Sequence, residues 1–158
     1  MKYDFAILTL DEPVRDEFAS IVLSAGADEE VGQKATVAGW GTIKQNGAQS
    51  EVMLEMQVPI ITNEICNQNV TGIYSSMVCA GGDANNACLG DSGGPMFTFN
   101  DNERPTLVGV VSWGIGCAQA NLPGVYARVS TVQAWVQANT DASEWGESGS
   151  SILDEFNA

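Results

Sequence analysis

Histidine is absent from this sequence of 158 residues. Histidine is the side chain that most often exchanges protons near neutral pH, and it is the commonest protein ligand for transition metals. The four cysteines include no Cys-x-x-Cys pair, so clustered thiolate ligands are missing as well. We therefore expect no metal site, and a histidine base would have to come from outside this sequence.

Basic residues are also scarce. Six Lys and Arg residues stand against 20 Asp and Glu residues, which gives a formal net charge of -14. Such a charge repels nucleic-acid phosphates and anionic lipids, so neither is an expected partner. The acidity is more typical of a solvated surface than of a site for cationic substrates.

Long apolar runs are missing too, and none approaches the length that crosses a bilayer. The first residues, Met1-Lys2-Tyr3-Asp4-Phe5, carry a carboxylate where an export signal needs an apolar stretch, so we expect no export signal in the sequence as written. Four cysteines allow three disulfide pairings and are consistent with an oxidising compartment. These two expectations conflict unless an upstream part of the protein is absent.

Short β-type runs, separated by turn residues and 17 glycines, are what the sequence does contain. They predict an all-β fold with a barrel or sandwich around one core. The second run alternates, with Val52, Leu54, Met56, Val58 and Ile60 on one face. The runs cover Ala35–Trp40, Val52–Ile60, Met77–Ala80, Met96–Phe99, Leu107–Trp113 and Val125–Val129.

The two ends of the sequence differ from this pattern. Tyr3–Leu10 is a dense apolar run that predicts a buried strand ending in a turn near Pro13, and a shorter run covers Ala19–Leu23. This opening segment is too small to form its own core. The polar, acidic stretch from Thr140 to Ala158 predicts a disordered tail, in which Ile152, Leu153 and Phe156 form at most a weak docking motif.

Two helices are expected. A short one follows Thr62, and a longer one begins where Ser130 and Gln133 form a capping box. Val132, Trp135 and Val136 have helical spacing in the second, which predicts an apolar stripe that docks onto the barrel.

The hexapeptide Gly90-Asp91-Ser92-Gly93-Gly94-Pro95 is the most specific motif. Glycines beside a serine allow a tight turn in which backbone N–H groups converge above the hydroxyl. Gly90-x-Ser92-x-Gly94 also fits the nucleophile elbow of α/β-hydrolases, but that motif requires a following helix and a downstream histidine. Pro95 begins a β-type run and no histidine follows, so the elbow is disfavoured.

The hexapeptide resembles the nucleophile segment of the chymotrypsin/trypsin-like serine protease family. Further segments resemble the family in the same order along residues 3 to about 139: Asp4-Phe5-Ala6-Ile7-Leu8, Gly39-Trp40-Gly41-Thr42, Ala87-Cys88-Leu89, Ser112-Trp113-Gly114 and Pro123-Gly124-Val125-Tyr126. The resemblance implies that residues 31–139 form the second chymotrypsin-like antiparallel β-barrel with a C-terminal helix. Residues 1–30 are then a remnant of the first barrel and a linker, before the tail at 140–158.

The implied activity is that of a secreted serine endopeptidase that needs no cofactor and meets polypeptide substrates or protein inhibitors. By the same resemblance, Ser92 is the nucleophile, the N–H groups of Gly90 and Ser92 bind the oxyanion, and Asp4 orients the base. Asp91 corresponds to the carboxylate that pairs with a newly cleaved N-terminal amine. Without that amine, an unpaired buried carboxylate is costly, and we expect its loop to be poorly ordered.

The resemblance also implies the disulfides and the substrate pocket. It pairs Cys66 with Cys79 and Cys88 with Cys117. It places Asn86 at the pocket base with Ala87 beside it, and it places Gly114 and Gly124 in the pocket walls. Ser112-Trp113-Gly114 is then the strand edge that binds substrate backbone, although Trp113 is equally consistent with a core or rim position. No acidic residue lies at the base, so basic substrate side chains are disfavoured.

The missing histidine leaves two explanations: a protease sequence truncated at its N-terminus, or a noncatalytic homologue that acts as a binding module. Truncation is favoured, because a module has no chemical need for Ser92, Asp91 and Asp4 together. The triplet Asn69-Val70-Thr71 separately fits an N-glycosylation sequon. Such triplets are common by chance and matter only in a secretory eukaryote.

Overall fold

Six antiparallel strands close into a barrel in the described part of the chain. The structure is a computed structural model, and it describes residues 1–15, 17–44, 46–82, 88–99, 103–116, 121–141 and 143–148. The order around the barrel is β2-β3-β4-β7-β6-β5. Strand β5 pairs with β6 on one side and with β2 on the other, and these two pairings close the barrel. The expected all-β, chymotrypsin-like barrel is therefore confirmed.

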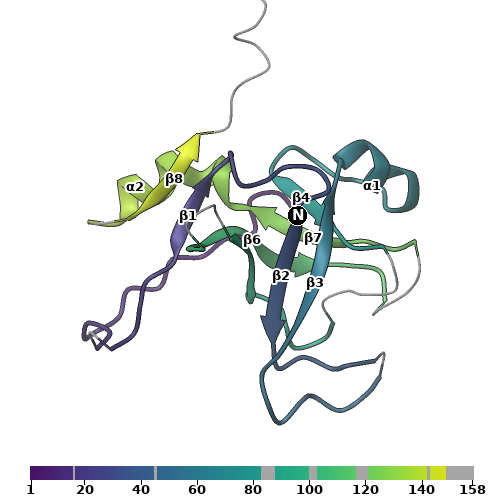
Figure 1. Cartoon of the computed structure of the whole chain (residues 1–158), viewed down its shortest axis with the longest axis horizontal. Coiled ribbons are helices and arrows are strands. Elements are labelled where there is room, and N and C mark those ends of the chain that lie inside the picture. The colour runs from purple at the N-terminus through teal and green to yellow at the C-terminus, as the bar shows by residue number, and fades with distance from the viewer. Residues whose placement is uncertain are drawn as a thin grey trace, which may run out of the picture.

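The elements follow the predicted runs closely. The barrel strands are β2 (Lys34–Gly39), β3 (Leu54–Ile61), β4 (Met77–Ala80), β5 (Pro95–Phe99), β6 (Pro105–Trp113) and β7 (Gly124–Arg128). The remaining elements are β1 (Val22–Ala25), α1 (Asn63–Asn69), the 3₁₀-helix η1 (Val129–Val132), α2 (Gln133–Asn139) and β8 (Trp145–Ser148). Figure 1 shows α1 on one side of the barrel and β1, β8 and α2 on the other.

The barrel interior holds the main core. Val58 and Ile60 of β3 are buried there as their alternation predicts, whereas Val52 and Leu54 are exposed. Gly109 of β6 has no room for a side chain, because a Cβ there would lie 2.9 Å from Met96 Cε and 2.9 Å from Tyr126 Cβ. The core side chains come from all six strands: Ala35, Val37, Val58, Ile60, Val78, Ala80, Met96, Val108, Val111 and Tyr126.

A second cluster of buried side chains lies between α1, β4 and β7. It contains the predicted Cys66–Cys79 disulfide, whose S–S distance is 2.02 Å. The α1 helix begins after Thr62, whose hydroxyl accepts a hydrogen bond from Ile65 N–H at 3.1 Å. The cluster also includes Val70 and is packed against Trp113. The short predicted helix and its disulfide are thus confirmed.

The second predicted helix starts differently from the expected capping box. The chain first makes the 3₁₀ turn η1, and α2 begins at Gln133 with no side-chain cap. Thr131 instead donates its hydroxyl to the Arg128 carbonyl at 2.7 Å. Of the expected apolar stripe, Val132 is buried, but Trp135 is exposed. The capping box is therefore wrong, because the backbone leaves β7 through a tighter turn than an α-helical start allows.

The predicted disorder from residue 140 onward is wrong for residues 145–148. These residues form β8, which pairs in parallel with β1, and β1 in turn pairs in parallel with β6. Leu23 N–H donates to the Glu144 carbonyl at 2.8 Å, and Glu144 forms an ion pair with Arg104 at 3.0 Å. This polar segment is ordered because β1 supplies hydrogen-bond partners for its backbone. Residues 149–158, with Ile152, Leu153 and Phe156, lie outside the described part.

The predicted buried strand at Tyr3–Leu10 is also wrong. No described strand pairs with these residues, and the structure assigns them no regular element. Leu8 and Leu10 are 83% and 61% exposed. A β-type run needs hydrogen-bonding neighbours, and the described barrel offers none at this position.

Candidate active site

The turn that carries Ser92 lies between Cys88 and β5. Asp91 N–H donates to the Cys88 carbonyl at 3.1 Å, which closes the first part of the turn. Gly90 and Gly93 have positive φ angles of 101° and 81°, a backbone region that glycine enters without steric cost. The glycines of the motif therefore bend the chain on both sides of Ser92, whose residue surface is exposed.

Strand β6 holds this turn in place. Gly93 N–H donates to the Val111 carbonyl at 2.9 Å, and Val111 N–H donates to the Gly94 carbonyl at 2.9 Å. These two bonds tie the residues after Ser92 to the barrel wall. The position of Ser92 is therefore held by hydrogen bonds to strand β6.

The Asp91 carboxylate has partners within this chain. One oxygen accepts from Gly41 N–H at 2.7 Å, and the other accepts from Cys88 N–H at 3.0 Å. The expectation of an unpaired carboxylate is therefore wrong, because backbone N–H groups take part of the role that was assigned to a charged amine. A Cβ at Gly39 or Gly41 would overlap this carboxylate, so both positions need glycine.

The segment that contains Gly41 contacts the Ser92 turn at a second point. Thr42 N–H donates to the Leu89 carbonyl at 2.9 Å, and the Thr42 hydroxyl lies 2.6 Å from Cys88 Sγ. The Gly-Trp-Gly-Thr segment thus braces the residues that precede the nucleophile loop. This explains why the two motifs occur together.

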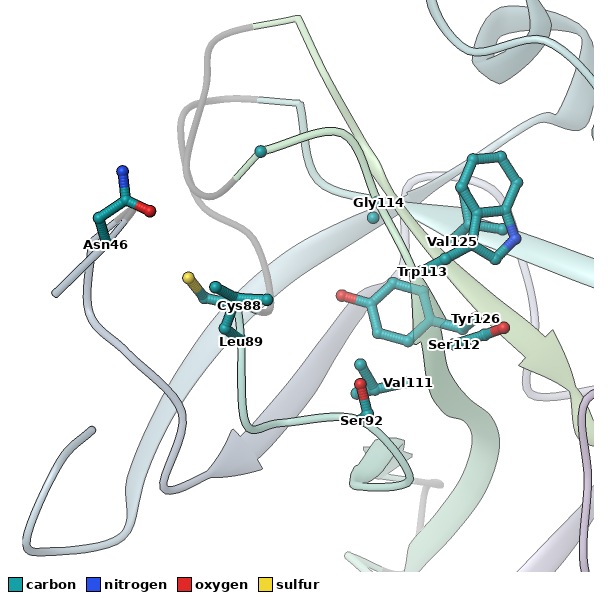
Figure 2. Close-up of a pocket in the computed structure, with 12 residues that line it drawn as sticks. Asn46, Cys88, Leu89, Ser92, Val111, Ser112, Trp113, Gly114, Val125 and Tyr126 are labelled. Carbon is teal, nitrogen blue, oxygen red and sulfur yellow. The ribbon is translucent and has the colours of Figure 1, made fainter. Parts of the chain in front are cut away.

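A cavity of about 360 Å³ opens beside Ser92. Figure 2 shows Ser92 on its turn together with Val111, Ser112 and Tyr126 around this cavity. The expected substrate-contacting residues Ser112, Trp113, Gly114 and Gly124 all line it. The described lining contains no charged side chain; its further members are Asn46, Cys88, Leu89, Gly116 and Val125.

The two N–H groups expected to bind an oxyanion are those of Gly90 and Ser92. Among the described residues, neither group donates a hydrogen bond to another protein atom. Both residues are exposed on the turn that carries Ser92, so their two unengaged N–H groups are consistent with an oxygen-binding position there.

Asp4 reaches the same region from the other end of the sequence. Its carboxylate accepts a hydrogen bond from the Ser112 hydroxyl at 2.7 Å. Ser112 also lines the cavity with Ser92, so one strand residue connects the expected orienting carboxylate to the wall beside the expected nucleophile. The family resemblance implied a substrate-binding role for Ser112, and no pattern in the sequence indicated this bond, because the two residues are 108 positions apart.

Some expected site residues lie outside the described part of the chain: Asn86 and Ala87 of the pocket base, and Cys117. Cys88 itself is disulfide-bonded. Across the described ranges no cluster of three or more His, Cys, Asp or Glu residues could hold a metal ion, and no helix is long and apolar enough to span a membrane.

The family model for trypsin matches residues 1–136. The chain belongs to the trypsin family. Membership supports a serine endopeptidase function at the level of the family.

Curated relatives of the trypsin family support the assignment. The chain is 43% identical over 143 residues to "Trypsin 5G1" of Aedes aegypti, covering 85% of this chain and 52% of that protein. It is 39% identical over 143 residues to "Trypsin eta" of Drosophila melanogaster, covering 86% and 53%. It is 37% identical over 146 residues to "Transmembrane protease serine 11G" of Rattus norvegicus, covering 87% and 35%. The chain thus spans about half the length, or less, of these relatives.

Membership of the trypsin family explains the order of the motifs but not every lining residue. Asn46 and Leu89 line the cavity, and residue patterns did not single them out as contacts. Leu89 could have been found, since it lies next to Gly90 in the nucleophile segment. Asn46 sits in the turn between β2 and β3 and carries no motif of its own, so only the fold brings it to the cavity.

Proposed function

We propose that this chain supplies the nucleophile-bearing half of a serine endopeptidase site. The observation that carries the proposal is that Ser112 donates to Asp4 at 2.7 Å while lining the same cavity as Ser92. Asp4 is then the carboxylate that orients a base, and Ser92 is the residue that the base activates. The unengaged N–H groups of Gly90 and Ser92 support an oxyanion site between them.

The proposed reaction is hydrolysis of a peptide bond through an acyl-enzyme. The Ser92 oxygen attacks the carbonyl carbon, its proton passes to the base, and the negative oxygen is bound by the two N–H groups. The base then protonates the leaving amine, and water releases the acyl group by the same steps. The sequence contains no histidine, so the base belongs to polypeptide outside these 158 residues.

The N-terminal region supports the proposal that further polypeptide completes the site. Residues 1–30 are proposed to be the remnant of a first barrel and the linker to the second, which comprises residues 31–139. Leu8, Leu10, Val14 and Phe18 are all more than half exposed, as expected for side chains that pack against a further part of the domain. A chain that spans about half of its relatives is consistent with such a missing partner.

The cavity supports a preference for large uncharged substrate side chains. Its described walls are uncharged, and Val111, Val125 and Tyr126 supply apolar surface. A Cβ at Gly114 would meet nothing within 4 Å, so this wall leaves room for a large group. Asn86 is proposed at the base with Ala87 beside it, and neither supplies the carboxylate that a Lys or Arg side chain needs.

The disulfides support an extracellular location for the protein.

A noncatalytic binding module is the second candidate, because a protein that works without further polypeptide would have no histidine base. In that case the cavity would bind a polypeptide without cleaving it. The two candidates differ in one measurable property, the reactivity of Ser92 once the rest of the domain is present.

The test uses a serine-directed fluorophosphonate probe. We expect negligible labelling of this chain alone and clear labelling of a longer polypeptide that also carries the histidine-bearing half, with Ser92→Ala as the control. In the longer protein, Ser112→Ala should lower kcat more than it raises KM, because Ser112 holds Asp4. Absence of labelling in a folded longer protein would favour the binding module.

A further inference from the structure

Asn69 ends helix α1 and begins the triplet Asn69-Val70-Thr71. It is the sole Asn-x-Ser/Thr triplet in the sequence, and its middle residue is not proline. In the structure Asn69 and Thr71 are exposed, whereas Val70 between them is only 1% exposed and belongs to the cluster around the Cys66–Cys79 disulfide. The buried valine therefore fixes the backbone so that the two polar side chains of the triplet face solvent.

The other asparagines of α1 have structural roles. Asn63 Nδ2 donates to the Tyr74 carbonyl at 3.0 Å, and Asn67 Nδ2 donates to the Asn63 carbonyl at 2.9 Å. Asn67 Oδ1 also accepts from Ile73 N–H at 3.2 Å. Asn69, by contrast, makes no side-chain hydrogen bond to any described residue. Its amide is available for modification without loss of a bond that holds the fold.

We propose that Asn69 is an acceptor for an N-linked oligosaccharide. In the transfer, Asn69 Nδ2 forms a bond to the anomeric carbon of an oligosaccharide carried on a lipid pyrophosphate. The bond from that carbon to the pyrophosphate oxygen breaks, the lipid pyrophosphate leaves, and the amide nitrogen loses one proton. Thr71 is the hydroxyl residue that the transferase requires two positions after the acceptor.

The compartment and the surface both fit this modification. The Cys66–Cys79 disulfide needs an oxidising environment, and in eukaryotes N-linked transfer takes place in such a compartment. Ile65 lies four residues before Asn69 and so shares its face of the helix, where it is 45% exposed. An oligosaccharide on Asn69 would cover this apolar side chain and make the outer face of α1 more soluble.

An oligosaccharide on Asn69 would not be attached to any residue of the proposed active site. None of the residues that line the Ser92 cavity belongs to α1 or to the triplet. The inference therefore does not depend on whether the chain takes part in catalysis, and its test needs no activity assay.

The experiment is secretion of the full chain from insect cells behind an added export signal, followed by digestion with an N-glycanase. We expect the wild-type band to shift on digestion, and peptide mass spectrometry should find aspartate at position 69 after the enzyme has acted. Asn69→Gln and Thr71→Ala should lack the shift, whereas Thr71→Ser should retain it. Asn139→Gln is the matched control, because Asn139 is an exposed asparagine at the end of α2 with no Ser or Thr two positions later.

Wild-type chain that is secreted with its Cys66–Cys79 disulfide formed but with unmodified Asn69 would overturn the proposal. A shift that persists in Asn69→Gln would do so as well. If a variant is not secreted, the peptide analysis of the wild-type chain decides the question by itself.

Discussion

The ion pair between Arg128 and Glu29, in which the glutamate side chain is buried and the arginine partly exposed, gives the sharpest stability prediction. Arg128 Nη1 lies 2.6 Å from Glu29 Oε2, and the side chains are 24% and 4% exposed. Glu29 also accepts from the Ser24 hydroxyl at 3.0 Å, and Arg128 Nε donates to the Met77 carbonyl at 3.0 Å. The pair therefore joins the segment after β1 to the end of β7. We expect Arg128→Met to be strongly destabilising.

The magnitude follows from what the substitution leaves behind. Glu29 would remain a buried carboxylate with the Ser24 hydroxyl as its remaining identified partner, and the Met77 carbonyl would lose a donor. Removing one member of a fully buried pair typically costs about 3–5 kcal/mol, so for this partly exposed pair we expect about 3 kcal/mol, out of a total stability of about 5–15 kcal/mol. Arg128→Lys keeps the charge but cannot reproduce both bonds of the guanidinium, so its loss should be intermediate.

The chain contains its own controls. Arg15 pairs with Glu17 at 3.0 Å, but these side chains are 75% and 59% exposed. Arg15→Met should therefore change the free energy of unfolding by no more than about 1 kcal/mol. The double variant Glu29→Gln with Arg128→Met should be more stable than Arg128→Met alone, because it leaves no buried charge unpaired.

Urea unfolding followed by tryptophan fluorescence measures these differences. If reversible unfolding requires the protein completed with the rest of its domain, the same four variants are compared in that background. Equal losses for Arg128→Met and Arg15→Met would show that burial does not set the strength of this pair, and the reasoning would fail.

Three further predictions concern the disulfide, the Asp91 pocket and the C-terminal strand. Cys66 and Cys79 are separated by 13 positions, so replacing both with alanine should lower stability by about 3 kcal/mol in urea unfolding; a loss below about 1 kcal/mol would contradict this. Gly41→Ala should cost about 1–3 kcal/mol and displace the Asp91 loop in a crystal structure, because its Cβ overlaps the carboxylate, whereas Gly114→Ala should be nearly neutral. Ending the chain after Thr140 removes β8, so amide exchange in β1 should accelerate; unchanged exchange at Leu23 would mean that the β1–β8 pairing contributes nothing.

Local patterns predicted the barrel and the short helix well. Short β-type runs bounded by turn residues placed all six barrel strands to within two residues at either end, because the residue types that favour strands and turns act locally. Thr62 marked the start of α1 for a similar reason, since its hydroxyl bonds to a backbone N–H only three residues away. The same logic failed at Tyr3–Leu10, where the run is β-type but no described strand pairs with it.

In the candidate site, too, the sequence predicts the local conformations but not the contacts between distant segments. The turn around Ser92 could be predicted from its glycines, because the backbone conformations that they permit are local. The partners of Asp91, by contrast, are set by how the Gly41 segment packs against that turn, 50 positions away. No charge or periodicity in the sequence marks a backbone N–H as the partner of a particular carboxylate.

By itself, the sequence determined the strand positions, the nucleophile turn and the family, since each depends on residues close together or on an ordered set of motifs. Tertiary structure alone decided that Ser112 holds Asp4 across 108 positions, that Arg128 reaches Glu29 across 99, and that a polar segment forms β8. The physical reason is that these contacts depend on which surfaces the closed barrel brings together. A local pattern specifies the conformation of its own segment, but not the distant group that the segment will meet.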